Sequence, residues 1–316
     1  MPGAKHKSSA AKAVLGLGPA IPLAIALLHG AATTSGSAVA STSGIAPEVC
    51  GDGIEDYQSC HSGYPTGCNS TGKYDADLNE FKNMTSWANP QVQKWLTNLS
   101  SFQDLEKNLP SGLGKSNHGD FTDPLKALGE GEITGVIGYL YSVKAEGKES
   151  SNCQLDPGTD NENVDFHIFI GFDPAIAGQL RDHPPTAAEK KTMNQTSVIV
   201  EMTPHYRAQF HPEWTLAAVQ QEVGQQVKIT GQLMVDNEHY VSSQDCGRND
   251  ATGMCWRATV WELHPVTDFE VCGKEPCEQA SQDWVPLGQG RATNAGNNPA
   301  SPTRPAGTGK RRTPAQ

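Results

Sequence analysis

The chain has 316 residues, of which 36% are hydrophobic, 32 are glycine and 21 are proline, so it is expected to hold one or two domains with part of its length in tails or loops. Its formal net charge is -11 at pH 7. This acidic balance opposes non-specific binding to DNA or RNA, which depends on neutralising phosphates with Lys and Arg, and it makes nucleic acid the least favoured partner.

Residues 1–40 have the order of a secretory signal peptide. Three lysines precede an apolar run from Ala13 to Leu28, and a small-residue stretch follows that ends in Ala38-Val39-Ala40. The apolar run is short for a membrane span and contains two prolines. We therefore expect cleavage near Ala40 and a mature protein that is secreted or periplasmic, with no stable membrane span. The alternative is an uncleaved membrane anchor.

The chain contains eight cysteines, all beyond residue 49. An even number of cysteines behind an export signal predicts disulfide bonds in an oxidising compartment, and buried free thiols are the alternative. No pair of CxxC motifs is present, which disfavours a zinc site made of cysteines. The disulfide candidates are Cys50, Cys60, Cys68, Cys153, Cys246, Cys255, Cys272 and Cys277.

Two segments precede the predicted barrel. Residues 41–74 are rich in Gly, Ser, Thr and Cys and are expected to form a leader that disulfides hold in place. Residues 75–131 are predicted to form a helical segment followed by a linker. Apolar residues recur at spacings near three and four from Tyr74 to Met84 and from Ser86 to Leu109, whereas residues 110–131 are rich in Gly, Pro, Asn and Asp.

Residues 132–272 are predicted to form a mainly β domain. One helix separates the third strand from the fourth, and Gly135 and Gly138 in the first strand indicate a bulge or a tight bend. This order is that of an OB-fold, a five-stranded, partly open Greek-key barrel. Residues 273–316 are expected to be a disordered tail. The expected strands are 132–143, 164–172, 197–203, 226–235 and 257–263, the last with a continuation to 271, and the expected helix is 212–223.

Polar side chains recur on three of the predicted strands. Asp165 and His167 are two residues apart, as are Glu262 and His264, so each pair points to one face of its strand. Glu201 lies on the third strand, which neighbours both the second and the fifth in an OB barrel. We therefore expect these side chains to lie side by side, with the histidine that follows the fourth strand reaching the same rim.

Imidazoles combined with carboxylates suit zinc or another divalent ion. A metal-bound water would be a nucleophile near neutral pH, which would give a hydrolase, with phosphate esters as candidate substrates. The alternative is a hydrogen-bonded polar patch in which the histidines hold long loops in place. The candidate metal ligands are Asp165, His167, Glu201, His239, Glu262 and His264.

A second candidate site lies in the stretch from Thr203 to Arg207. The forked guanidinium of Arg207 matches carboxylates and phosphates, so His205 and Arg207 are candidate ligands for an anion. The alternative is that Arg207 pairs with a carboxylate at the end of the preceding strand.

Several runs of the sequence resemble a family of uncharacterised exported bacterial proteins with an OB-like fold. The resemblance implies the fold but no activity, because the family has no established function. This chain departs from the family between His239 and Arg257, where an insertion brings Cys246 and Cys255, nine residues apart, which are expected to close a local loop. The matching runs are VEMTP at 200–204, HPEWTL at 211–216, VKITGQLMVDNEH at 227–239 and RATVWELHPV at 257–266, together with Arg207 and DFHI at 165–168.

Three functions remain open from the sequence. The favoured one is an exported OB-like binding module for an oligosaccharide, a protein or a small anion, because OB-folds present their second and third strands and the flanking loops to ligands. The second is a metal-dependent hydrolase, a phosphoesterase for example, built on the Asp, His and Glu cluster. The third is a structural exported protein with no small-molecule site.

Overall fold

The computed structural model of the protein describes residues 76–149, 151–152, 155–248 and 253–289. The predicted signal peptide, the leader with its three cysteines, and Cys153 lie outside the described residues. None of the helices in the described part is both long enough and apolar enough to cross a lipid bilayer.

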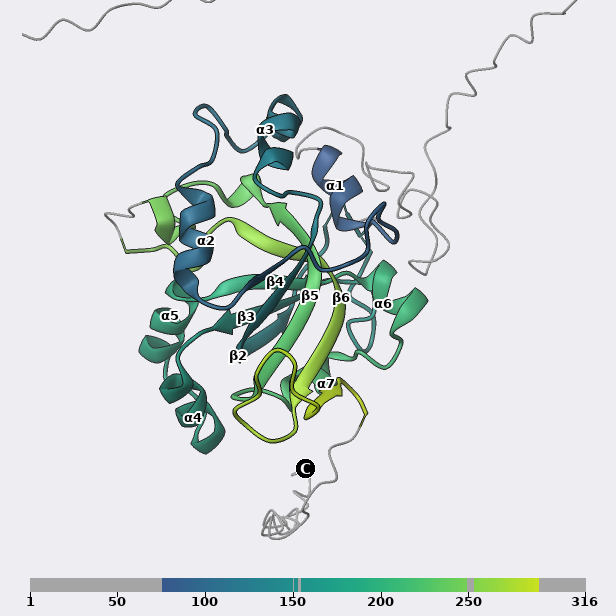
Figure 1. The fold of residues 1–316 in the computed structure, drawn as a ribbon, viewed down its shortest axis with the longest axis vertical. Helices are drawn as coiled ribbons and strands as arrows, with labels where there is room; N and C mark the ends of the chain where they lie inside the picture. Colours follow the sequence, from purple (N-terminus) through teal and green to yellow (C-terminus); the bar gives the residue numbers. More distant parts are fainter. Residues whose placement is uncertain (1–75, 150, 153–154, 249–252, 290–316) are drawn as a thin grey trace, which may run out of the picture. The chain divides into compact units, whose positions relative to one another are not determined.

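Five strands close into the predicted barrel (Figure 1). The order around the barrel is β2-β3-β4-β6-β5, and β5 pairs back with β2. The β4–β6 pairing is parallel and the other four are antiparallel. This arrangement confirms the OB-like prediction. The strands are β2 (Ile133–Ala145), β3 (Phe166–Gly171), β4 (Val198–Met202), β5 (Gln226–Val235) and β6 (Trp261–Cys272).

The hydrophobic core fills the barrel because alternate residues of each strand point inward. Phe166 and Ile168 of β3, Val200 of β4, and Trp261 and Leu263 of β6 are all fully buried in one cluster. The residues between them therefore point to the outer face of the barrel. The apolar side chains within the barrel thus determine where the polar residues of β3, β4 and β6 lie.

Gly135 and Gly138 of β2 allow neighbouring residues to lie close to the backbone of this strand. A Cβ at Gly135 would lie 2.4 Å from ring atoms of Trp95, and one at Gly138 would lie 2.7 Å from the carbonyl oxygen of Gly171. The register shift between β2 and β3 falls between Leu140 and Ser142, beyond both glycines. The glycines therefore make room for neighbouring elements, and the irregularity that they were expected to mark lies further along the strand.

The N-terminal segment differs from the prediction. The first helix is present as α1 (Ala76–Lys82), but residues 86–109 do not form one helix. They contain β1 (Lys94–Leu96), which pairs in parallel with β2, and α2 (Leu99–Glu106). Asn98 is the N-cap residue of α2: its backbone is extended, and its side chain accepts a hydrogen bond from the Ser101 amide. The helix therefore starts directly after Asn98. Pairing with β2 thus overrides the helical spacing before Asn98.

Short helices fill segments that were expected to be a linker or an insertion. The expected linker 110–131 holds a 3₁₀ turn, η3 (His118–Phe121), and α3 (Thr122–Ala127). The insertion between β3 and β4 holds α4 (Pro174–Asp182) and α5 (Ala187–Gln195). Asp173 and Thr186 cap these two helices with their side chains, which the spacing of apolar residues could not reveal.

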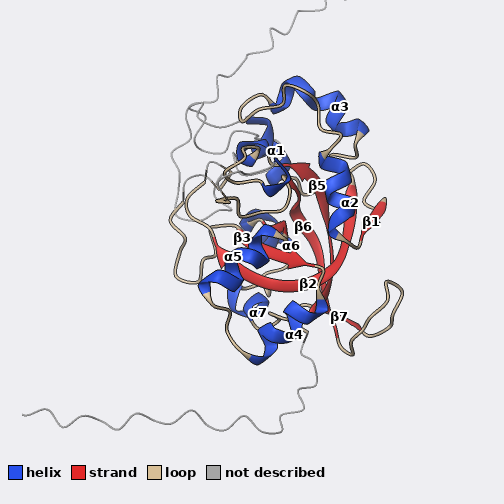
Figure 2. Ribbon diagram, turned by 90° about the vertical axis from the view of Figure 1, so that its left-hand side faces the viewer, coloured by secondary structure: helices blue, strands red, loops and turns tan. Residues whose placement is uncertain are grey.

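The helix expected between the third and fourth barrel strands exists, but it is divided. The segment contains α6 (Pro204–Phe210) and α7 (Leu216–Gln220) in place of one helix from 212 to 223. Thr215 accepts a hydrogen bond from the Ala218 amide and starts α7. As Figure 1 and Figure 2 both show, α1 and α3 lie toward one end of the barrel, and α4 and α7 lie toward the other.

The barrel continues past its expected boundary at Cys272. After β6 the chain turns and forms β7 (Trp284–Pro286), which pairs antiparallel with β6, so part of the expected tail belongs to the sheet. Two disulfides join Cys246 to Cys255 and Cys272 to Cys277, and the first confirms the expected local loop. Residues 290–316 lie outside the described residues.

Candidate functional site

The predicted polar residues of β3, β4 and β6 gather on the outer face of the barrel. His167 and Glu201 are register partners across the β3–β4 pair, and Glu262 is paired with Ile199 of β4. Glu201, Glu262 and His264 are fully buried, as is Asp165, which directly precedes β3. The structure therefore brings five of the six candidate metal ligands into one buried polar layer.

Three segments cover this layer. They are α1 with the residue after it and the described parts of two connections: the one between β2 and β3, where Asn152 donates to Asp165, and the one between β5 and β6, where Arg257 donates to Glu262. Thr203 Oγ1 donates to the Lys82 carbonyl, and Asn83 Nδ2 donates to the Ser151 carbonyl, which ties α1 to the barrel and to the first connection.

His167 lies between two carboxylates. Its Nδ1 is 2.6 Å from Glu146 Oε1, and its Nε2 contacts Glu201 Oε1. Burial by itself would lower the pKa of His167, but the negative charges of Glu201 and Glu146 outweigh it and raise the pKa to about 10. The ring is thus held as a cation beside a cavity that it helps to line.

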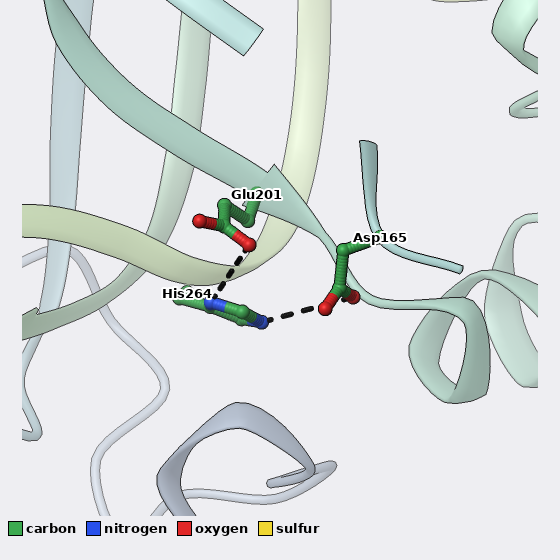
Figure 3. A group of neighbouring side chains, drawn as sticks. All are labelled: Asp165, Glu201 and His264. Carbon is green, nitrogen blue, oxygen red and sulfur yellow. Dashed lines mark ion pairs between the residues drawn. The ribbon is translucent and has the colours of Figure 1, made fainter. Parts of the chain in front are cut away.

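His264 lies at the centre of the buried layer (Figure 3). Its Nδ1 is 3.2 Å from Glu262 Oε1 and 3.3 Å from Glu201 Oε2, and its Nε2 is 3.9 Å from Asp165 Oδ1. Figure 3 shows that Glu201 and Asp165 contact different nitrogens of the imidazole. Asn152 Nδ2 donates to Asp165 Oδ2 at 3.0 Å. Burial raises the pKa of Asp165 to about 7.

Arg257 is a central member of the layer that the sequence did not single out. Its guanidinium is fully buried and donates to Asp236 Oδ2 at 2.9 Å, to Glu262 Oε2 at 2.6 Å and to the Thr259 carbonyl at 2.9 Å. Asp236 in turn contacts His239 Nδ1. The sixth candidate ligand, His239, therefore joins the layer through Asp236 and Arg257 and not through the Asp165–His264 cluster.

A cavity of about 590 Å³ opens beside the layer. His167 and His239 both line it, so the two ends of the polar layer meet the same cavity. Lys82 lies in the wall of the cavity and is almost completely buried. Burial by itself would lower the pKa of Lys82, but the negative charges of Glu149 and other carboxylates raise it well above its usual value. Besides His167, the charged residues of the wall are Lys82, Lys115, Lys148, Glu149, Asp236 and Glu238.

The second candidate site, at His205 and Arg207, is part of the packing. Arg207 Nη2 donates to the Val164 carbonyl at 2.6 Å, its Nε donates to the Met202 carbonyl at 3.2 Å, and its guanidinium lies 3.6 Å from the centre of the Phe166 ring. Both His205 and Arg207 are buried. The guanidinium thus donates to backbone carbonyls, and the interpretation of His205 and Arg207 as anion ligands stays a prediction.

No family model, no curated protein and no solved structure matches the chain. The resemblance to a family of exported bacterial proteins therefore stays a prediction. What the site does has to be argued from its own geometry.

Proposed function

We propose that this protein binds a small anion in the cavity beside the buried layer. The cavity is lined by the two connections that OB-folds use for ligands, the one between the first and second barrel strands and the one between the fourth and fifth. Lys148 and Glu149 come from the first connection, and Asp236, Glu238 and His239 come from the second.

The covered outer face favours a small ligand over an oligosaccharide or a protein. Those ligands need an open surface across the second and third strands, where α1 and the connection 146–165 lie over the polar half of this face. The apolar half packs Phe169 and Ile199 with Ala177 of α4 and Met193 of α5. A cavity of about 590 Å³ lies within the size range of small-molecule sites.

The balance of charge in the cavity is the observation that carries the proposal. Two of its three acids, Glu149 and Asp236, have cationic partners, whereas two of its lysines remain accessible. Glu149 lies 3.4 Å from the Lys82 amine, and Asp236 is bound by Arg257. Lys115 is exposed, and Lys148 makes a solvent-exposed ion pair with Asp156, which contributes little and can be exchanged. The chemistry fits a carboxylate, sulfate or phosphate group.

We also propose that the protein works outside the reducing cytosol, as its predicted signal peptide implies. The support is the pair of disulfides, Cys246–Cys255 and Cys272–Cys277, because such bonds persist in oxidising compartments.

The test is calorimetric titration of the disulfide-intact protein with sulfate, inorganic phosphate and citrate, and with spermidine as a probe of opposite charge. We expect saturable binding of at least one anion and none of spermidine. Lys115→Ala and Lys148→Ala should each weaken anion binding several-fold, because each removes one charge from the cavity wall. Lys126→Ala, which removes an exposed lysine of α3 outside the cavity wall, is the matched control.

Two results would contradict the proposal. One is saturable binding of spermidine in place of the anions, since it would mean that the acids dominate the cavity. The other is anion binding that falls equally in Lys115→Ala and Lys126→Ala, because a non-specific response to surface charge would then explain it.

A further inference from the structure

We propose that a divalent transition-metal ion, with Zn²⁺ as the first candidate, binds between His264 Nε2 and Asp165 Oδ1. This site lies in the buried layer and not in the cavity wall, and the inference does not depend on the anion proposal. Three observations carry it: the orientation of the imidazole, the separation of the two facing atoms, and the charges around them.

The imidazole of His264 is oriented as in a carboxylate–histidine–metal arrangement. Metal-binding histidines nearly always donate their second ring N–H to a carboxylate or a carbonyl, which leaves the other nitrogen free for the ion. Nδ1 of His264 faces Glu262 at 3.2 Å and Glu201 at 3.3 Å, so the N–H belongs on this nitrogen. When an ion displaces any proton from Nε2, the lone pair of this nitrogen would point toward Asp165, which Nε2 faces in Figure 3.

The two facing atoms are too far apart for a hydrogen bond and have the separation expected for a bridging ion. Nε2 of His264 and Oδ1 of Asp165 are 3.9 Å apart, both side chains are fully buried, and neither atom has a hydrogen-bond partner within the described part of the chain. Zinc–nitrogen and zinc–oxygen distances of about 2.0–2.2 Å span this separation with a bent N–Zn–O angle. Asn152 binds the other oxygen of Asp165, which leaves Oδ1 directed at the ring.

The surroundings contain more buried carboxylate than fixed positive charge. Arg257 is engaged by Glu262 and Asp236, and Lys82 is engaged by Glu149. Asp165 has no such ion pair with Lys or Arg among the described residues. A buried carboxylate is costly unless it is paired or bound to a metal, so a cation at this point would lower the cost of burying Asp165.

Glu201 is a positioning residue in this arrangement. Donor atoms of Asp165, Glu201 and His264 all lie within 4.8 Å of one another, which by itself would allow three ligands. The contact of Glu201 that Figure 3 draws, however, goes to Nδ1 of the ring, whereas that of Asp165 goes to Nε2. We therefore assign the ion to His264 and Asp165 and assign Glu201, with Glu262, to holding the ring.

The first measurement uses the wild-type protein with its disulfides intact. It is depleted of metal with a chelator and then titrated with Zn²⁺ and, separately, with Co²⁺. We expect saturable binding, a rise in the unfolding temperature with Zn²⁺, and X-ray absorption by the bound zinc that shows an imidazole nitrogen together with oxygen ligands. This measurement does not depend on any variant folding.

The second measurement compares variants. Asp165→Asn keeps the size of the side chain and a partner for Asn152, and we expect it to abolish the Zn²⁺-dependent rise in unfolding temperature, as should His264→Gln. Glu262→Gln should weaken zinc affinity by about 10–100-fold, as loss of a carboxylate behind a metal-binding histidine does. The controls are His183→Gln and Asp123→Asn, which change exposed residues outside the layer and should leave zinc binding intact.

Three outcomes would overturn the inference. The folded wild-type protein could fail to bind Zn²⁺ and Co²⁺, which would leave a doubly protonated His264 as the partner of Asp165. The bound zinc could lack an imidazole ligand. Alternatively, Asp165→Asn could bind zinc as tightly as wild type. None of these outcomes affects the anion titration, so the two proposals fail independently.

Discussion

The guanidinium of Arg257 and the carboxylate of Glu262 form a fully buried ion pair, with Nη2 2.6 Å from Oε2. The same guanidinium binds Asp236 at 2.9 Å, at the start of the β5–β6 connection. One side chain thus joins β6, which carries His264, to the segment that lines the cavity. This relationship links the buried layer to the wall of the cavity and leads to the first prediction.

Arg257→Met should destabilise the protein strongly. The substitution leaves two buried carboxylates without their cation, and breaking a buried ion pair from one side costs about 3–5 kcal/mol. Urea denaturation measures the free energy of unfolding. Arg257→Lys is the comparison, since it keeps the charge without the fork that binds both carboxylates, and it should lose less. A loss below about 1 kcal/mol in Arg257→Met would show that the layer reorganises without this residue.

Removing the Cys246–Cys255 disulfide should affect both stability and ligand binding. The bond closes a short loop in the connection that lines the cavity, so Cys246→Ser with Cys255→Ser should cost about 2 kcal/mol of stability and weaken anion binding. Cys272→Ser with Cys277→Ser provides the control, because that bond follows β6 and contributes no residue to the cavity wall. Calorimetry on both pairs should show a loss of affinity in the first pair alone. Equal affinities would mean that the loop does not shape the cavity.

Gly135→Ala should destabilise the pairing of β1 with β2. The new Cβ would lie 2.4 Å from ring atoms of Trp95, which forces the indole or the strand to move, and overpacking of this kind costs about 1–3 kcal/mol. Gly147→Ala is the matched control, since a Cβ there meets nothing within 4 Å. Chemical denaturation of the two variants gives the comparison. A Gly135→Ala protein as stable as Gly147→Ala would mean that the indole moves aside without cost.

Anion binding should weaken as the pH rises through about 7. Burial disfavours the charged form of Glu238 in the cavity wall and raises its pKa to about 7. The negative charges of Asp236 and Glu149 also raise this pKa, whereas Lys82 and His239 lower it. Below this pH the carboxyl is neutral and does not repel an anion, and above it a negative charge develops in the wall.

Sulfate is the suitable probe, because it does not titrate in this range. Its dissociation constant, measured by calorimetry between pH 6 and 8, should increase several-fold in the wild type and stay nearly constant in Glu238→Gln. The same increase in the Glu238→Gln variant would assign the pH dependence to another group.

The elements that the sequence predicted well are those specified by local pattern. The bounds of β5 were predicted without error. Alternation in β3 and β4 placed Phe166, Ile168 and Val200 on the inner face of the barrel, because inward residues are apolar. It placed His167 and Glu201 on the outer face. The helical spacing at residues 86–98 misled the prediction because Lys94–Leu96 pair with β2, and a strand pairing is not visible in local spacing.

The sequence by itself determined the order of the barrel strands and the residue types on their outer face, since both follow from alternation and from chain breaks. Only the tertiary structure decided what those residues became. Whether Asp165, Glu201 and His264 would be exposed or buried depended on α1 and two connections far away in the chain, and Arg257 and Lys82 acquired their partners only when these segments closed over the face. The desolvation and the ion pairing that shift the pKa values of the site arise from that closure, and no local spacing encodes them.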